Sequence, residues 1–413
     1  MLLQSVLGLA AFIGLAWLVS EKRSEVRYRT ALAGVAVQLG IAAVLLYVPA
    51  FKKLFVLLNG VVLSLEAATK AGTSFVFGYI GGGTPPFLLK DPGAGFILAF
   101  QALPLVLVIG ALSALLFHWR ILPLIVKTFS LLLQKTLNVG GALGLGASTT
   151  IFLGMVEAPL VIKPYLRDMT RSELFSLMTV GMACIAGTVM ILYATILNGV
   201  IPDPLGHILT ASFIHVAAAI TISRIMIPET GQETAGSLAP QRTAAGSMDA
   251  LVKGTMDGLH LLLNIIAMLV VMVALVHLVN LALGLLPDAG GSPVTLQRLL
   301  GFVMAPVVWL FGIPWAEAPT AGSLMGTKTI LNELLAFLDL AKLPEGALDG
   351  RSRMIMTYAL SSFANLGSLG ILIGGLGTLV PERRDEVVAL GMKALVAGTL
   401  ATCMTGSVIG IFA

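Results

Sequence analysis

Two glutamates, Glu157 and Glu333, lie in the middle of otherwise apolar stretches of the chain. The stretch around the first runs over 147–165 and is interrupted by Gly154 and Pro159. A carboxylate inside a membrane is costly unless it faces a polar cavity. A segment that enters the membrane and turns back near Gly154 accounts for all three residues, because irregular backbone is tolerated where it lines a cavity. The alternative is an ordinary apolar helix in which Glu157 contacts a structural partner.

The second glutamate has similar surroundings. It follows Asn332 in the apolar stretch 314–340, which contains Gly322 and Gly326. Two later apolar segments are also interrupted by small or polar residues, at 183–188 and 361–368. Two carboxylates, an amide and a hydroxyl that meet at mid-membrane suit a ligand with several hydroxyl groups. Unwound backbone carbonyls beside them suit a small cation.

The composition shows what kind of protein surrounds these residues. Of the 413 residues, 57% are hydrophobic and only 11% are charged, with a mean hydropathy of +0.97. Soluble domains carry about 25% charged residues, so the chain is a polytopic membrane protein. The net charge of +4 concentrates in loops and does not form a nucleic-acid surface. Cys184 and Cys403 lie in apolar runs, which argues against a disulfide scaffold.

The orientation follows from the first loop. The run 1–19 lacks a basic segment before its apolar core, so we interpret it as a spanning helix and not as a signal peptide. The loop 21–29 is rich in Lys and Arg. The positive-inside rule therefore predicts that this loop is cytoplasmic and that the amino terminus lies outside.

The apolar pattern divides the chain into six parts. We expect two spans and an amphipathic interfacial helix within 1–94, with Glu66 and Lys70 on the polar face of that helix. The other parts are a scaffold span at 95–117, a first repeat at 121–227, a linker at 228–259, a scaffold span at 260–286 and a second repeat at 295–413.

The two repeats show the same order of elements. Each begins with an interfacial helix and continues with a broken hairpin, at 140–166 in the first and 314–340 in the second. Two spans follow in each repeat, at 174–199 and 204–227 and at 352–378 and 388–412. Interrupted apolar segments at corresponding places in two halves indicate the binding site of a secondary transporter.

Four motifs add a specific resemblance. Gly154-Met155-Val156-Glu157-Ala158-Pro159-Leu160, Leu331-Asn332-Glu333, Phe363-Ala364-Asn365, and Gly374-Gly375-Leu376-Gly377 followed by Pro381-Glu382-Arg383-Arg384 are similar to motifs of the concentrative nucleoside transporter family. The resemblance covers nearly the whole chain. It implies an all-α membrane protein of about eight transmembrane helices, two re-entrant helical hairpins and interfacial helices, an inverted-repeat elevator-type transporter that assembles as a homotrimer.

The resemblance also implies roles for individual residues. The substrate would be a nucleoside, with its base near Met155, Val156, Glu157 and Val189. The ribose hydroxyls would meet Glu333, Asn365 and Ser368, with Phe363 nearby. In a sodium-coupled member, the ion would lie at Thr150, Leu153, Cys184 and Ile185.

Three positions depart from the family pattern. Met155 and Val156 stand where polar side chains are usual, which predicts that packing replaces hydrogen-bond recognition of the base and that discrimination is weaker. Thr150 stands where sodium-coupled members have Asn. Cys184 stands where Ser or Thr is common, and sulfur is a poor ligand for a hard cation. Both Na⁺ and H⁺ therefore stay candidates for the coupling cation.

Other residues that could do chemistry have simpler interpretations. The histidines show no metal-ligand spacing with carboxylates, and we interpret them as packing or interfacial residues: His118, His207, His215, His260 and His277. We expect Lys163 and Lys328, near the hairpin arms, to extend toward a membrane interface.

The sequence thus predicts a cation-coupled nucleoside importer in a bacterial inner membrane, with the bilayer as its surroundings, and neither an enzyme nor a nucleic-acid-binding protein. The alternatives are a passive channel for polar solutes and a transporter of the same fold for a modified nucleoside. A channel would need a continuous polar stripe, and an intramembrane enzyme would need an acidic metal cluster or a catalytic pair near the membrane surface. The sequence presents none of these features.

Overall fold

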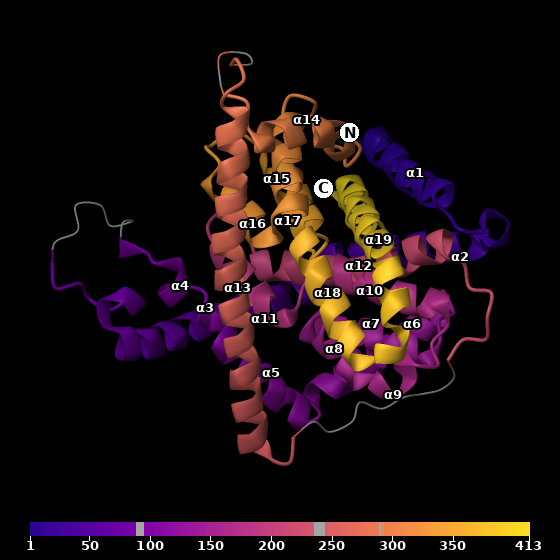
Figure 1. Ribbon diagram of the computed structural model, residues 1–413, viewed down its shortest axis with the longest axis horizontal. Helices are drawn as coiled ribbons and strands as arrows, with labels where there is room; N and C mark the ends of the chain where they lie inside the picture. Colours follow the sequence, from indigo (N-terminus) through magenta and orange to yellow (C-terminus); the bar gives the residue numbers. More distant parts are fainter. Residues whose placement is uncertain (88–94, 235–243, 289–290, 292) are drawn as a thin grey trace.

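The protein is described by a computed structural model over residues 1–87, 95–234, 244–288, 291 and 293–413. These residues form helices and connecting turns, with no β-strand among them (Figure 1). The predicted all-α architecture is confirmed. The middle of the predicted linker, 235–243, lies outside the described residues.

Six helical segments in the described part of the chain are long and apolar enough to cross a membrane. They are Tyr28–Tyr47 (α2), Leu98–His118 (α4, Leu98–Gln101, with α5, Leu105–His118), Arg171–Ile196 (α10, Arg171–Ala183, with α11, Gly187–Ile196), Pro204–Met226 (α12), Ser247–Leu283 (α13) and Pro381–Phe412, which contains α19 (Arg384–Phe412). The shorter α1 (Leu2–Leu18) and the interrupted pair α17 (Gly350–Leu360) and α18 (Leu366–Leu379) bring the crossing segments to the predicted eight.

Two boundaries differ from the sequence prediction. We expected the amphipathic helix at 54–80; the corresponding helix α3 covers Pro49–Phe77, because Pro49 supplies a favourable first helical residue. The helix α13 begins at Ser247, inside the segment 228–259 that we expected to be a linker. Asp249 and Lys253 form an i,i+4 ion pair at 2.8 Å, and this polar first turn made the helix resemble a loop in sequence.

Both predicted hairpins are present as helix pairs. The first consists of α7 (Gly141–Leu153) and α8 (Glu157–Val161), followed by the short α9 (Lys163–Leu166). The second consists of α15 (Ala318–Ile330) and α16 (Glu333–Lys342). Each is preceded by a helix of intermediate length, α6 (Ile121–Leu137) and α14 (Leu296–Trp309). The arm α7 is buried all round over most of its length, as expected of an apolar helix inside a bundle.

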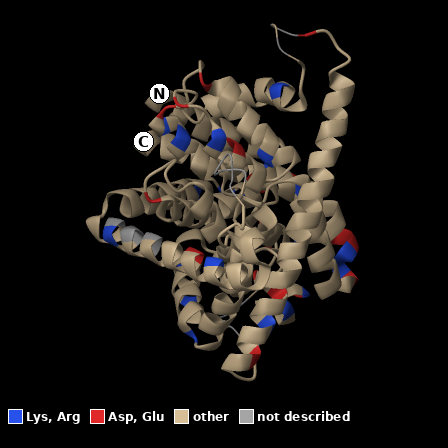
Figure 2. Cartoon of the chain, turned by 90° about the vertical axis from the view of Figure 1, so that its left-hand side faces the viewer, with Lys and Arg blue, Asp and Glu red and all other residues tan. Residues whose placement is uncertain are grey.

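The helix α13 lies at the side of this bundle. In Figure 1 it runs through almost the whole height of the molecule, with α3 and α4 on one side and the hairpins on the other. After Asp257 it contains no Lys, Arg, Asp or Glu, and Figure 2 shows the same long uncharged stretch. The exposed side chains of this stretch, such as Val270 and Leu278, suit contact with lipid.

Ion pairs join the loop after α1 to the helices α10 and α19. Glu21, in the loop after α1, contacts Arg171 at 3.0 Å and Lys393 at 2.6 Å, and Arg171 also lies 3.6 Å from Glu386. Burial alone would raise the pKa of Glu21, but hydrogen bonds from Arg171 and Lys393 outweigh it and lower the pKa below its ordinary value. These ion pairs therefore connect the loop after α1 with α10 and α19 in one layer.

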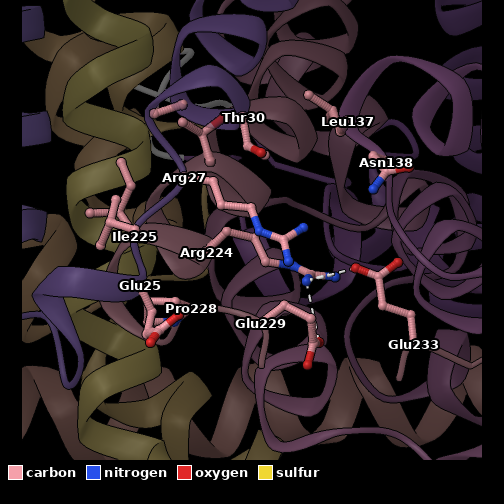
Figure 3. A pocket seen from close by; sticks show the side chains of 13 residues that line it. Glu25, Arg27, Thr30, Leu137, Asn138, Arg224, Ile225, Pro228, Glu229 and Glu233 are labelled. Carbon is pink, nitrogen blue, oxygen red and sulfur yellow. Dashed lines mark hydrogen bonds and ion pairs between the residues drawn. The ribbon is translucent and has the colours of Figure 1, made fainter. Parts of the chain in front are cut away.

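A small cavity beside this layer is lined by charged side chains of the segment that follows α12 (Figure 3). Arg224, at the end of α12, contacts Glu229 at 3.2 Å and Glu233 at 2.9 Å. Burial raises the pKa of Glu233. These contacts attach the segment 228–234 to the bundle, and we assign the cavity a structural role.

Candidate functional site

The tip of the first hairpin turns at Gly154. This residue has φ +95°, and a Cβ there would lie 2.8 Å from the Cβ of Ala186. Only glycine adopts this conformation readily. The helix α8 then begins at Glu157, which places a carboxylate at a helix N-terminus, where the helix dipole favours negative charge.

Two breaks in the crossing helices lie next to the hairpins. The first separates α10 from α11, where Gly187 approaches the hairpin so closely that a Cβ would lie 2.8 Å from the carbonyl oxygen of Phe152. The second separates α17 from α18. The backbone N–H of Phe363 in the second break donates to the carbonyl of Cys184 in the first, at 3.3 Å. The two unwound segments therefore touch.

A cavity of about 380 Å³ lies between the hairpin tips, the breaks and α13. This volume is within the range of small-molecule sites. All eight side chains that the sequence suggested for substrate line this one cavity: Met155, Val156, Glu157, Val189, Glu333, Phe363, Asn365 and Ser368. They come from four helices (α8, α11, α16 and α18), from the turn of the first hairpin and from the break between α17 and α18.

Glu333 is held in place on both of its carboxylate oxygens. The hydroxyl of Tyr193 donates to Oε1 at 2.6 Å, and the amide Nδ2 of Asn365 donates to Oε2 at 2.9 Å. The amide oxygen of Asn365 caps α18 by accepting the backbone N–H of Ser368 at 2.8 Å. A carboxylate has about four lone-pair positions, so Glu333 keeps acceptor capacity for a pair of ligand hydroxyls.

Glu157 and Glu333 differ in their surroundings. Glu333 is buried, whereas Glu157 is half-buried. Across the cavity, α13 contributes Asp257, whose negative charge repels that of Glu157. At the other end of the same cavity, a Cβ on Gly367 would lie 3.1 Å from the terminal methyl of Met268 on α13. The helix α13 therefore runs along the cavity, from the side of Glu157 to the side of Gly367.

The four residues suggested for a cation lie behind the first hairpin tip, on the ends of two helices. Thr150 and Leu153 belong to the last turn of α7, and Cys184 and Ile185 directly follow α10. Helix C-termini carry partial negative charge and unpaired carbonyls, which favour a cation. The Cys184 sulfur points to the carbonyl of Ser212 at 3.8 Å, and the Thr150 hydroxyl donates to the carbonyl of Gly146 at 2.9 Å.

Two sequence interpretations are wrong. His260, which we interpreted as a packing or interfacial residue, lines the cavity. Lys328, which we expected to extend to an interface, is fully buried, with its amine 3.4 Å from the hydroxyl of Thr402. The helix α15 packs against α14, α16 and α17, and the Lys328 side chain extends to Thr402 on α19 inside the bundle.

Sequence reasoning also missed residues that line the cavity, namely Thr188, Tyr193, Asp257 and Asn264. The spacing of Asp257, His260 and Asn264 would have shown a polar row on one helix face. Tyr193 gave no such signal, because one tyrosine in an apolar helix resembles an ordinary core residue.

Comparison with known proteins gives consistent matches along the chain. Residues 7–80 match the N-terminal model and residues 207–410 the C-terminal model of the Na⁺-dependent nucleoside transporters, and residues 99–199 match a domain described as nucleoside recognition. An uncharacterized transporter of Haemophilus influenzae is 37% identical, covering 99% of this chain and 97% of the relative. The nucleoside permease NupC of Helicobacter pylori is 33% identical, covering 99% and 97%.

Solved structures agree with these matches. The transporter CNTnw in an inward-facing substrate-bound state superposes with a TM-score of 0.91 at 33% identity, covering 100% of this chain and 98% of that one. A CNTnw variant in an outward-facing state superposes with a TM-score of 0.89.

Proposed function

Because this chain belongs to the Na⁺-dependent nucleoside transporter family, we propose how its cavity binds a nucleoside and how its first hairpin couples transport to a cation. The protein is a transporter and not an enzyme. It is a multi-pass protein of the bacterial inner membrane, and it imports nucleosides by cation-coupled, elevator-type alternating access. Family membership sets aside the alternative of a passive channel.

The main support for the proposed binding mode is the way in which Glu333 is held at the cavity. Its two oxygens accept hydrogen bonds from Tyr193 and Asn365, and the residue lines the cavity. We assign the ribose hydroxyls to Glu333, Asn365 and Ser368, with Phe363 beside the sugar. We assign the base to Met155, Val156, Glu157 and Val189, at the other end of the cavity.

For coupling, we propose one Na⁺ at the ends of α7 and α10. The Thr150 hydroxyl and the carbonyls of Leu153, Cys184 and Ile185 supply oxygen ligands, which a hard cation prefers. The Cys184 thiol takes no part, since its sulfur faces Ser212. A tenfold gradient of a monovalent ion with about 100 mV supplies about 3.7 kcal/mol, enough for several-hundred-fold accumulation. We also propose that the chain forms a homotrimer, as its family membership suggests.

Uptake of labelled uridine and adenosine into proteoliposomes tests the proposal. We expect accumulation above equilibrium with an inward Na⁺ gradient and no accumulation with a proton gradient alone. Accumulation driven by protons alone would overturn the sodium site and leave the nucleoside site standing. Glu333→Ala should abolish uptake while the oligomer seen by light scattering stays the same. Normal uptake by this variant at saturating substrate would overturn the ribose assignment. If the substrate is not an ordinary nucleoside, neither labelled uridine nor labelled adenosine will enter the proteoliposomes.

A further inference from the structure

A row of polar side chains on α13 faces the cavity from the wall opposite the hairpin tips. Asp257, His260 and Asn264 are spaced by three and four residues, so they lie on one face of the helix, and all three line the cavity. The next cavity-lining residues along α13, Ile265 and Met268, are apolar. The polar part of this wall is therefore confined to one end of the cavity.

That end is the one near Glu157. Asp257 interacts electrostatically with Glu157, whereas Met268 approaches Gly367 beside Asn365 and Ser368. The polar row thus faces the half of the cavity to which the base is assigned, and the apolar residues face the half assigned to the ribose.

The row is held in this direction by a close helix contact. Gly254 and Gly258 of α13 meet Gly110 and its neighbours on α5, and a Cβ on Gly254 would lie 2.5 Å from the carbonyl of Gly110. Such contacts between small residues bring helix backbones together. Because these glycines occupy the face adjoining the polar row, the contact fixes the rotation of α13 about its axis.

The polar groups of the row are available to a ligand. Among the described residues, none makes a hydrogen bond to the side chain of His260 or Asn264. An amide offers two donors and two acceptor positions, and a neutral imidazole offers one of each. The edge of a nucleobase presents donors and acceptors of the same kinds.

The first hairpin tip supplies few such groups. Met155 is only 7% exposed, and Val156 packs against α18, where a Cβ on Gly375 would lie 3.2 Å from it. Glu157 is the polar side chain of this tip. A base between the tip and α13 would therefore find most of its hydrogen-bond partners on α13.

We propose that His260 and Asn264, with Asp257 beside them, determine base preference by hydrogen bonding to the base edge. This inference rests on the proposed nucleoside site and adds a specificity role for α13. The carboxylates of Asp257 and Glu157 at this end favour bases that present N–H donors, such as the exocyclic amine of adenosine or cytidine.

The test uses full-length protein in proteoliposomes and compares KM for adenosine, cytidine, uridine and inosine. We expect His260→Leu and Asn264→Leu each to change the KM ratio between bases by about three- to tenfold, the effect of one hydrogen bond. The ratio of KM for uridine and 3′-deoxyuridine should stay constant, since the ribose end is untouched. His260→Gln, which keeps a donor and an acceptor, should retain most of the preference of the unmodified protein.

His277→Leu is the matched control, because His277 lies on the same helix and is exposed away from the cavity. Unchanged KM ratios between the bases in both leucine variants, with uptake still abolished by Glu333→Ala, would overturn the role of α13 and leave the nucleoside site intact. Equilibrium binding of the four nucleosides to purified protein gives a second measurement for a variant that transports poorly. Failure of the unmodified protein to bind any of them would instead contradict the proposed function.

Discussion

The hydroxyl of Tyr193 lies 2.6 Å from the carboxylate of Glu333, across a separation of 140 residues. Tyr193 belongs to the second half of a broken helix in the first repeat, and Glu333 opens a hairpin helix in the second. Both side chains are buried. This hydrogen bond therefore connects the two repeats at the cavity and, with the bond from Asn365, holds the carboxylate in place.

We expect Tyr193→Phe to weaken nucleoside binding by about tenfold or more, because a hydrogen bond to a charged group contributes about 1.5–3 kcal/mol. The loss should appear in KM and in the equilibrium Kd. It should be smaller for a nucleoside analogue that lacks a ribose hydroxyl, since Glu333 acts on those hydroxyls. Tyr28→Phe, at an exposed tyrosine, is the control. Equal losses for both ligands would show that Tyr193 has only a structural role.

Thr150→Val should raise the Na⁺ concentration needed for half-maximal uptake by several-fold and leave uptake at saturating Na⁺ largely intact. The reason is that valine has the shape of threonine but lacks the oxygen ligand. Cys184→Ala should change the Na⁺ dependence little, because the thiol faces Ser212 and the backbone carbonyl remains. Uptake is measured at graded Na⁺ for both variants. A large change in the Na⁺ concentration for half-maximal uptake with Cys184→Ala, and no change with Thr150→Val, would contradict the proposed arrangement of Na⁺ ligands.

Met155→Gln should alter the order of preference among nucleosides, because it places an amide of similar length at the base end of the cavity. We expect competition by unlabelled nucleosides to change by about three- to tenfold for at least one base. The same change at Met392, which is 56% exposed on α19, should have no effect. An identical competition profile for Met155→Gln would remove this residue from the base contacts.

Glu21→Gln should lower the free energy of unfolding at neutral pH by about 1 kcal/mol or less, as expected for a partly exposed ion pair. The pKa of Glu21 is lowered in the folded protein, so its stabilising effect is present above the ordinary carboxyl pKa and is lost as pH falls through the folded value. The difference between the two proteins should therefore vanish in acid. Unfolding of detergent-solubilised protein is measured at pH 7 and at a pH well below the folded pKa of Glu21, and a difference that persists in that acid would show that the charge is not responsible.

Much of this architecture could be predicted from the sequence because the relevant signals are local. Gly154, Pro159 and Glu157 within an apolar run indicate a hairpin, and Asn365 within another indicates a break. The order of such segments indicates two repeats. The grouping of eight residues into one site came instead from the resemblance of four motifs to a known family, and the structure places all eight on one cavity.

Other features depend on contacts that a single sequence does not reveal. The polar row on α13 escaped notice because Asp257 and Asn264 lie in a long helix, and which face of a helix meets a cavity is decided by the glycines that pack against α5. The burial of Lys328 was missed because an isolated lysine in an apolar segment usually extends to an interface. The beginning of α13 was missed because its first turns are polar.

The hydrogen bond from Phe363 to the carbonyl of Cys184 connects a residue of the proposed ribose site to a residue of the proposed cation site. We infer that a cation bound at the first break would restrict the second through this bond, so that part of the entropy cost of forming the nucleoside site would be met before the nucleoside arrives. Thermodynamic reciprocity then requires the nucleoside to increase cation affinity by the same factor. The unloaded carrier and the carrier with both ligands thus become the favoured species, and a half-loaded carrier, which would dissipate the ion gradient without moving substrate, is kept scarce.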